Sequence, residues 1–389
     1  MADSDTTNVQ RRQFLKFSGA VMGGAALAGV SQPTLAKTEV SPTFKKPTAD
    51  HPIRICWNEN PLGMSPKGQA AAREMIGQGN LYPFMEMKTL QKMLADKHGV
   101  APECVLLSAG ATQGIVAAFG ALATPDTQLV IPELTFSAGE EAAIDNSMKK
   151  ITKVKMTKDW QIDLEAMKKA VADYDGPSIV YFVNPNNPTG AICKADAVEA
   201  WIKSKPAKTM FLMDEAYAEF ASDPTFRSVS PLIKDGADNI VLLKTFSKLF
   251  AMAGMRVGWS VSTPAIIKKM GEKIANNNLT GASVSAAIAS MKDDKFMELS
   301  RASNEAARKI LLQTLDALKL DYVPSNTNFV FHKLHVPLAD YQKRMKDAGI
   351  WVGRAFPPAD EYCRCSLGTP EQMAYVAQVM LDLGKKGLI

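Results

Sequence analysis

Short apolar runs alternate with helix-length segments between residues 105 and 261, and this alternation constrains the fold more than any other feature. Near-continuous apolar strands separated by helices indicate a mostly parallel sheet that helices cover on both faces. We therefore predict an α/β fold whose larger domain holds a mostly parallel seven-stranded sheet. The candidate strands are Val105–Ser108, Gln128–Ile131, Ile151–Val154, Ser178–Val183, Met210–Asp214, Ile240–Leu243 and Val257–Val261, and the segments between them include the candidate helices Thr112–Leu122, Leu164–Ala172 and Ala195–Lys203.

The pattern changes after about residue 282, where a long helical stretch precedes shorter strands. This texture is typical of a second, smaller α+β domain. We predict a large domain at 76–285 and a small domain at 286–389, which residues 53–75 join from the N-terminal side. The elements expected in the small domain are a helix at Asp293–Leu318, strands at Asn328–Phe331, Ile350–Val352 and Arg364–Leu367, and a final helix at Glu371–Leu383.

The N-terminal segment differs in composition from the rest of the chain. The pair Arg11-Arg12 precedes a weakly apolar, Ala- and Gly-rich run from Phe17 to Val30, and a small residue, Ala36, ends the segment. A charged start, a short apolar run and a small-residue exit form the secretory pattern, and the arginine pair resembles the twin-arginine export signal. The alternative is a buried or membrane-lying helix, but four glycines in the run oppose it at about 1 kcal/mol each. We predict a signal peptide at 1–36 and a mobile lead-in at 37–52, hence export by the twin-arginine machinery or a periplasmic location.

Composition excludes several classes of protein. The chain has 389 residues, 46% hydrophobic and 22% charged, so it is neither disordered nor fibrous. Its net charge of +5 comes from 45 basic and 40 acidic residues without a concentrated basic run, so we expect no nucleic-acid partner. No apolar run approaches the roughly 18 residues that a membrane span needs. Five cysteines without a CxxC pair, and His332 and His335 without a third ligand, predict no metal site.

Polar motifs follow four of the predicted strands. In parallel sheets ligands bind at the carboxyl ends of the strands, so chemistry is expected at these motifs. Each motif alone is weak evidence for a functional site, because Gly-Ala-Thr and Asn-Pro turns commonly connect helices and strands. Their combination in this order is specific. The motifs are Ser108–Thr112, Asn184–Gly190, Asp214–Tyr217 and Thr245–Lys248, the last followed by Arg256.

With these motifs the chain resembles the class I/II aminotransferases, which are fold-type-I pyridoxal-phosphate (PLP) enzymes, and in particular their histidinol-phosphate aminotransferase branch. The resemblance covers the chain from about Ile53 to its end. It implies a PLP cofactor, ping-pong transfer of an amino group between an amino acid or amino phosphate and a 2-oxo acid through a Schiff base on Lys248, and a homodimer with shared active sites. The matching segments are Asn58–Gly63, Tyr82-Pro83, Asn187–Gly190, Asp214–Tyr217, Ser247-Lys248 and Arg364–Thr369.

The resemblance also implies a role for each matching residue. Lys248 would carry the cofactor and shuttle protons, and Asp214, at the end of an apolar strand, would pair with the pyridinium nitrogen. Asn187 and Tyr217 would contact the phenolic oxygen of the cofactor. The phosphate would be held by a backbone turn, hydroxyl groups and a guanidinium, with a tyrosine from the partner subunit. These phosphate ligands are Gly110, Ala111, Thr112, Thr245, Ser247, Arg256 and Tyr82.

Four further residues complete the predicted site. Phe136 would stack on the cofactor ring, although a simple core position is the alternative. Arg364 would grip the substrate carboxylate with its guanidinium fork, and Asn328 and Asn60 would be second contacts in that pocket.

The same cofactor cage serves other reactions, so a PLP-dependent decarboxylase, lyase or cyclase is the alternative function. A non-catalytic PLP-binding module is disfavoured, because Lys248, Asp214 and Arg364 are all present. The identity of the amino donor and acceptor stays open.

Overall fold

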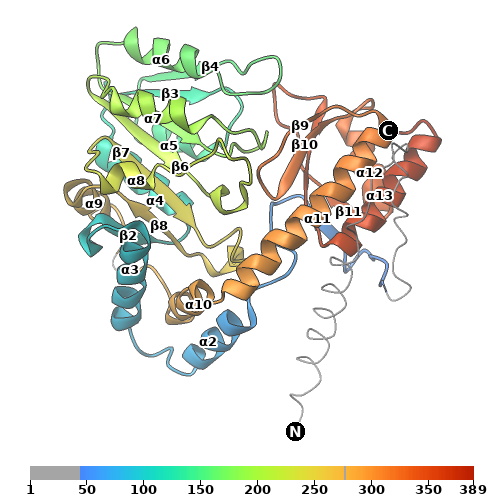
Figure 1. Ribbon diagram of the computed structural model, residues 1–389, viewed down its shortest axis with the longest axis horizontal. Coiled ribbons are helices and arrows are strands. Elements are labelled where there is room, and N and C mark those ends of the chain that lie inside the picture. The colour runs from blue at the N-terminus through green and yellow to red at the C-terminus, as the bar shows by residue number, and fades with distance from the viewer. Residues whose placement is uncertain (1–43, 276) are drawn as a thin grey trace, which may run out of the picture. The chain divides into compact units, whose positions relative to one another are not determined.

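The computed structural model describes residues 44–275 and 277–389, and its centre is a seven-stranded sheet (Figure 1). The strand order is β2-β8-β7-β6-β5-β3-β4, and only β8 runs antiparallel to its neighbours. This confirms the predicted mostly parallel sheet, with strand ends shifted by at most two residues. The strands are β2 (Val105–Ser108), β3 (Gln128–Pro132), β4 (Lys150–Val154), β5 (Ser178–Val183), β6 (Thr209–Asp214), β7 (Ile240–Thr245) and β8 (Gly258–Val261).

Helices cover both faces of this sheet because its strands are apolar on both faces. In β5, Ile179 and Tyr181 point into one apolar layer, whereas Val180 and Phe182 point into the other. The first layer contains α4 (Ala111–Leu122), α5 (Ala138–Asp145) and α9 (Pro264–Gly271). The second contains α3 (Phe84–His98), α6 (Leu164–Ala172), α7 (Ala195–Lys203), α8 (Ser230–Lys234) and α10 (Gly281–Met291).

The C-terminal third builds a separate apolar core around two small sheets. Strand β10 lies antiparallel between β9 and β12, and β1 pairs in parallel with β11. Three helices pack on these sheets, of which α11 is the long helix expected from the sequence. The elements are β1 (Ile53–Ile55), β9 (Tyr322–Val323), β10 (Phe329–Lys333), β11 (Ile350–Val352), β12 (Tyr362–Ser366), α11 (Asp294–Leu318), α12 (Leu338–Asp347) and α13 (Pro370–Lys385).

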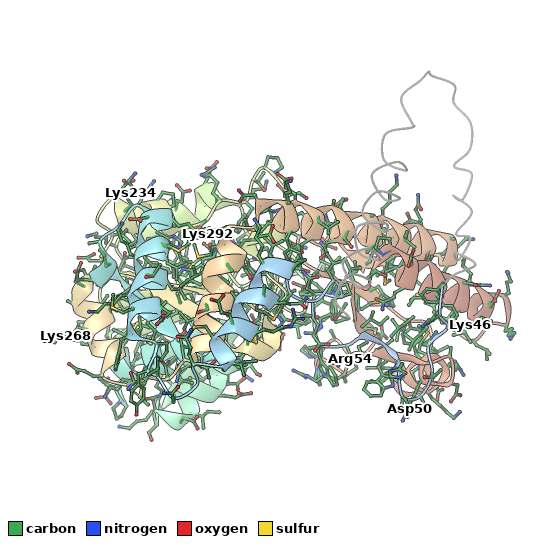
Figure 2. The ribbon with its side chains drawn as sticks, turned by 90° about the horizontal axis from the view of Figure 1, so that it is seen from below. Lys46, Asp50, Arg54, Lys234, Lys268 and Lys292 are labelled. Atoms are coloured by element: carbon green, nitrogen blue, oxygen red, sulfur yellow. The ribbon has the colours of Figure 1, made fainter. Side chains whose placement is uncertain are left out.

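Residues 53–75 divide between these two parts. Strand β1 pairs with β11, as the prediction requires, but α2 (Pro66–Ile76) packs against α10. Figure 2 shows Arg54 of β1 beside the C-terminal helices and Lys268 of α9 at the end that holds the large sheet. The domain boundaries stay a prediction, and the packing of α2 favours a boundary closer to residue 64 than to residue 75.

The N-terminal predictions fall mostly outside the described residues. The predicted signal peptide at 1–36 lies wholly outside them, as does the first half of the predicted mobile lead-in at 37–52. The described end of that lead-in packs on the small core, where the rings of Phe44 and Tyr375 lie 5.6 Å apart. Within residues 44–275 and 277–389, no helix is both long enough and apolar enough to cross a membrane. All five cysteines are free thiols.

Candidate active site

A cavity of about 290 Å³ opens at the carboxyl ends of the central strands. Loops after β2, β3, β5, β6 and β7 line it on one side, and β12 and the loop before it contribute from the C-terminal part. The structure therefore brings most of the predicted site residues together. The predicted residues that line the cavity are Ala111, Thr112, Phe136, Asn187, Asp214, Tyr217, Thr245, Ser247, Lys248, Arg256 and Arg364.

Asp214 ends β6 and is almost completely buried. Its carboxylate accepts hydrogen bonds from the Tyr181 hydroxyl at 2.9 Å and from the Ala216 amide at 3.0 Å. Burial raises the pKa of Asp214 to about 6, although both hydrogen bonds and the Lys248 charge favour the ionised form. A carboxylate held in this way is costly without a cationic partner, so the site is prepared for a cation at this position. Tyr181 could not be identified from the sequence as a site residue, because it lies within the apolar strand β5.

Lys248 follows β7 and lies beside Tyr217. Its Nζ donates to the Asn58 carbonyl at 3.2 Å and lies 5.4 Å from the centre of the Tyr217 ring. The Tyr217 hydroxyl accepts a hydrogen bond from Asn58 Nδ2 at 3.0 Å, and Ser366 Oγ donates to Asn58 Oδ1 at 2.8 Å. Asn58 thus joins the lysine and the tyrosine, a role that the sequence analysis missed.

The local backbone explains the position of Asn58. It has φ of 55°, in the left-handed region where asparagine is among the more tolerated residues, and it is buried. Asn58 belongs to the matching segment Asn58–Gly63, in which the sequence singles out Asn60 as a substrate contact. The sequence pattern alone did not identify the role of Asn58, because the residues that its side chain contacts lie more than 150 positions away in the chain.

The other end of the cavity is an anion cradle. Helix α4 begins after Gly110, and no side chain caps its N-terminal amides, which leaves them available to an anion. Thr245 Oγ1 donates to Ser247 Oγ at 2.8 Å, and the Arg256 guanidinium lies 3.5 Å from that hydroxyl. Gly110 has φ of +81°, and a Cβ there would overlap the Arg256 guanidinium. The predicted phosphate ligands of this subunit therefore lie together.

Arg364 projects from β12 into the cavity. Its Nη1 donates to Asn187 Oδ1 at 2.6 Å and its Nη2 to the Cys56 carbonyl at 2.8 Å. Its Nε is buried and has no partner among the described residues. The guanidinium also lies 4.8 Å from the centre of the Phe356 ring. This arginine is fixed in place by protein contacts and keeps donor capacity for a ligand.

The mouth of the cavity contains residues that the sequence analysis did not single out. Trp57, Arg354 and Phe356 line it, and the Arg354 guanidinium lies 4.5 Å from the centre of the Phe356 ring. Phe136 lines the cavity and also packs against the apolar layer around α4 and α5, so it meets both descriptions that the sequence allowed. Its stacking on a cofactor stays a prediction.

Four predicted residues lie outside the cavity lining: Gly110, which directly precedes the lining residue Ala111, and Asn60, Asn328 and Tyr82. Asn60 donates to the carbonyls of Lys248 and Leu249, at 3.2 and 3.1 Å, and so ties its loop to the lysine segment. Asn328 donates to the Asn58 carbonyl at 3.0 Å and is buried. Both asparagines hold the loop that carries Asn58. Tyr82 is 70% exposed, in the segment between α2 and α3, and does not contribute to the cavity of its own subunit.

The chain is similar to known proteins over most of its length. The family model for class I and II aminotransferases matches residues 50–380, and the twin-arginine translocation signal model matches residues 8–28. Histidinol-phosphate aminotransferase of Brevibacillus brevis is 31% identical over 335 residues, which span 85% of this chain and 90% of that protein. The corresponding enzyme of Lysinibacillus sphaericus is 32% identical over 332 residues, spanning 85% and 89%.

Two solved structures extend the comparison. A crystal structure named "Putative histidinol-phosphate aminotransferase" from Erwinia carotovora atroseptica is 56% identical, with a TM-score of 0.88, and covers 89% of this chain and all of that one. Histidinol-phosphate aminotransferase of Sinorhizobium meliloti, solved with pyridoxal-5'-phosphate, is 24% identical, with a TM-score of 0.79 over 92% of this chain and 99% of that one. At that identity the second comparison shows the fold alone.

The residues present suit the cofactor of this family. PLP carries a phosphate, for which the N-terminus of α4, the hydroxyls and Arg256 provide donors, and a ring nitrogen, for which the buried Asp214 carboxylate is a partner. The fold, the cavity and the match over residues 50–380 lead to one conclusion. The chain belongs to the class I and II aminotransferases and is a PLP-dependent aminotransferase with a twin-arginine signal sequence.

Proposed function

We propose that this enzyme transfers the amino group of a donor carrying a carboxylate or phosphate, with the cavity residues in the roles that the sequence predicted. One observation carries the proposal: among the described residues that line the cavity, Asp214 is the only acid, whereas Lys248, Arg256, Arg354 and Arg364 supply four cations. An acid suits the ring nitrogen of the cofactor, and the cations suit its phosphate and an anionic substrate.

PLP supplies the electron sink that stabilises negative charge at the substrate Cα. Lys248 then acts as the base that takes the proton from Cα and returns it, because its amine lies in the cavity beside Tyr217. Tyr217 and Asn187 would donate to the phenolic oxygen of the cofactor. The bond from Arg364 to Asn187 Oδ1 supports this, since it leaves the amide Nδ2 free to donate.

Arg364 binds the anionic group of the donor, and Arg354 and Trp57 meet the rest of the donor at the mouth. The relatives named as histidinol-phosphate aminotransferases support a phosphorylated donor. An amino acid with a free carboxylate suits the same arginines. A screen of donors with and without phosphate, on mature protein, separates these two classes.

The lysine assignment is tested with Lys248→Ala. We expect the purified variant to lose the visible absorption of bound cofactor and its amino-transfer activity. Lys268→Ala, which changes an exposed lysine of α9, is the matched control and keeps both. An unchanged absorption spectrum in Lys248→Ala refutes the assignment.

We further propose that the enzyme acts as a homodimer in which Tyr82 reaches the cofactor phosphate of the partner subunit. The support is an apolar surface around the α2–α3 connection, where five large side chains are between 53% and 71% exposed. Such a surface marks an interface, and Tyr82 lies within it. The five residues are Ile76, Leu81, Tyr82, Phe84 and Met85.

The dimer proposal is tested with Met85→Glu, which places a charge in this apolar surface. We expect sedimentation to show monomers and the affinity for PLP to fall. A variant that stays dimeric argues against this surface as the interface.

We also propose that the mature enzyme is periplasmic. The twin-arginine signal at residues 8–28, which lies outside the described residues, supports export. Replacing Arg11 and Arg12 by lysine should retain the enzyme in the cytoplasmic fraction. Activity that still appears in the periplasmic fraction of that variant contradicts the proposed route.

A further inference from the structure

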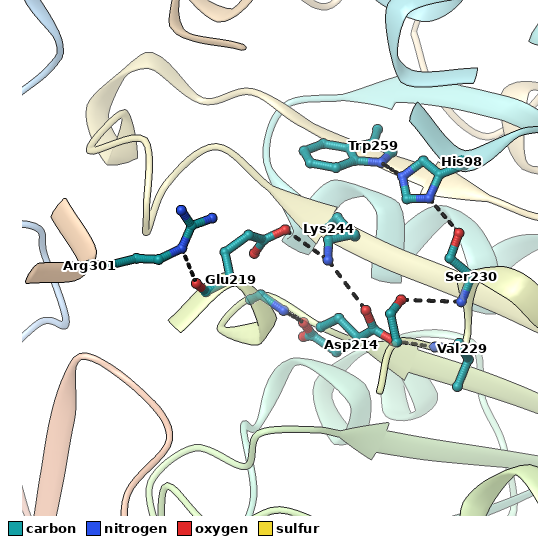
Figure 3. Close-up of polar contacts among 11 residues, drawn as sticks. His98, Asp214, Glu219, Val229, Ser230, Lys244, Trp259 and Arg301 are labelled. Carbon is teal, nitrogen blue, oxygen red and sulfur yellow. Dashed lines mark hydrogen bonds and ion pairs between the residues drawn. The ribbon is translucent and has the colours of Figure 1, made fainter. Parts of the chain in front are cut away.

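Three charged side chains are buried together on the face of the large sheet that α3 and α10 cover (Figure 3). They lie close to the segment that carries Asp214 and Tyr217. Lys244 Nζ lies 2.8 Å from Glu219 Oε1 and 3.3 Å from Glu215 Oε2. The side chains are only 6%, 13% and 2% exposed, respectively. We refer to Lys244, Glu215 and Glu219 as the ion triad.

The members of the ion triad are sequence neighbours of the cavity residues. Glu215 directly follows Asp214, Tyr217 lies between the two glutamates, and Thr245 directly follows Lys244. Successive side chains of a strand point to opposite faces of a sheet. Thr245 therefore faces the cavity, while Lys244 faces the apolar layer that contains α3 and α10.

The triad links two chain segments that both contribute to the site. One is the end of β6 with the turn that follows it, which carry Asp214 and Tyr217, respectively. The other is β7 with the loop that follows it, which carries Thr245, Ser247 and Lys248. Lys244 contacts a glutamate on each side of Tyr217, so a single ammonium group holds both ends of that turn against β7.

Each glutamate has a second anchor. Glu215 Oε1 accepts a hydrogen bond from the Val229 amide at 2.8 Å, and the Glu219 carbonyl accepts one from Arg301 Nε at 3.0 Å. A second cation, Lys97, lies close enough to act with Lys244 on Glu219. Burial would raise the pKa of Glu219, but these two lysines lower it overall. Together with Lys97, the cluster therefore contains two basic and two acidic side chains.

A buried ion pair of this kind adds little net stability, because desolvation of the charges offsets their attraction. Apolar side chains would fill the same space at no greater cost. The ion triad instead contributes a defined geometry. An ammonium group between two carboxylates fixes the separation of the chain segments that carry them.

We propose that Lys244 is a positioning residue that acts through Glu215 and Glu219 to hold Asp214 and Tyr217 in register with Lys248. The proposal rests on the roles proposed above for these three cavity residues. A shift of about 1 Å in such groups lowers turnover by about a hundredfold. Loss of the triad should therefore lower activity even where the chain remains folded.

The test variant replaces the whole triad by neutral side chains of similar size, Glu215→Gln, Glu219→Gln and Lys244→Met, so that no member of the triad keeps a charge without its partner. Lys244→Arg keeps the positive charge and donors for both carboxylates. Ile202→Ala, in α7 of the same apolar layer, is the control for a general loss of stability, because Ile202 is buried but does not contact the cavity.

The wild type and these three variants are all measured as holoenzymes. The readouts are melting temperature, kcat and KM, and the pH at which the visible absorption band of the bound cofactor changes. For the neutral triad we expect kcat to fall by about 10- to 100-fold with a smaller change in KM. We also expect the pH midpoint to rise by about one unit, because Tyr217 supports the ionised phenolic oxygen less well. Lys244→Arg should restore most of both properties.

Ile202→Ala should lower the melting temperature without moving the pH midpoint. A folded neutral triad with wild-type kcat and pH midpoint overturns the proposal, as does a pH midpoint that moves equally in Ile202→Ala. These outcomes leave the proposed function standing, because that function fails only if Lys248→Ala keeps its cofactor absorption.

Discussion

The substitution Asp214→Asn is expected to stabilise the cofactor-free protein while weakening its affinity for PLP. Burial raises the pKa of Asp214 to about 6 from an ordinary value of 3.8. A difference of about two pKa units corresponds to about 3 kcal/mol of folding free energy. The folded chain bears this cost at neutral pH, because it must keep a buried carboxylate ionised.

The pH dependence follows from the sign of this shift. Below pH 3.8 the carboxyl group is protonated in both the unfolded and the folded chain, so it costs nothing. Between 3.8 and about 6 the unfolded chain has lost the proton and the folded chain has not, so stability falls as the pH rises. Above about pH 6 the cost is constant. About half of it should be present at pH 5 and all of it at pH 8.

Asparagine preserves the local hydrogen bonds. Its Oδ1 can accept from the Ala216 amide, and its Nδ2 can donate to the Tyr181 hydroxyl, which reverses its role from donor to acceptor. We therefore expect cofactor-free Asp214→Asn to exceed the wild type by about 2–3 kcal/mol at pH 8 and by about half as much at pH 5. Its affinity for PLP should fall at least about tenfold, because a neutral amide cannot pair with a ring cation.

Urea unfolding of the cofactor-free proteins at pH 5 and pH 8 measures the first effect, and titration with PLP measures the second. Asp238→Asn is the control, because a hydrogen bond from Lys205 lowers the pKa of that exposed carboxyl group. This control should show no gain in stability. A cofactor-free Asp214→Asn that is less stable than the wild type at pH 8, or whose gain is equal at both pH values, refutes the reasoning.

Two further substitutions test other parts of the cavity. Arg364→Lys removes the guanidinium fork, so we expect KM for a carboxylate donor to rise by about 10- to 100-fold, with little change for the analogous amine that lacks the carboxylate. Steady-state kinetics with both donors measure this, and equal losses for the two would contradict carboxylate binding. Gly110→Ala places a Cβ against Arg256 at a positive φ, so the dissociation constant for PLP should rise at least about tenfold, as titration of the cofactor-free protein would show. An unchanged constant means that this turn does not bind the phosphate.

The large sheet was predictable because most of its strands are near-continuous apolar runs, and polar motifs follow four of them. The chemistry-bearing residues at the ends of β6 and β7, Asp214 and Lys248, could be placed for the same reason. Adjacent parallel strands bring their carboxyl ends to one edge, so linear position was enough to predict that these residues meet.

The predictions were weaker where position depends on contacts between distant segments. Asn60 and Asn328 are expected to touch substrate, which stays a prediction, and the sequence did not indicate that their amides also donate to the backbone around Asn58 and Lys248. The identity of an asparagine does not reveal whether its donors meet a ligand or a carbonyl. Arg354 lies in a loop without regular structure, so no periodicity pointed to it.

Side chains alternate between the two faces of the sheet along β6 and β7, so the buried charges also affect the register of these strands. Asp214 and Thr245 face the cavity, and their direct neighbours Glu215 and Lys244 face the opposite side of the sheet. A slip of either strand by one residue would exchange these faces, placing Lys244 in the cavity and leaving a glutamate without its cation. Apolar neighbours would tolerate such a slip at lower cost, because they suit either apolar layer. The ion triad therefore penalises the wrong register more strongly than a hydrophobic contact would, at the two strands where register decides whether the site forms.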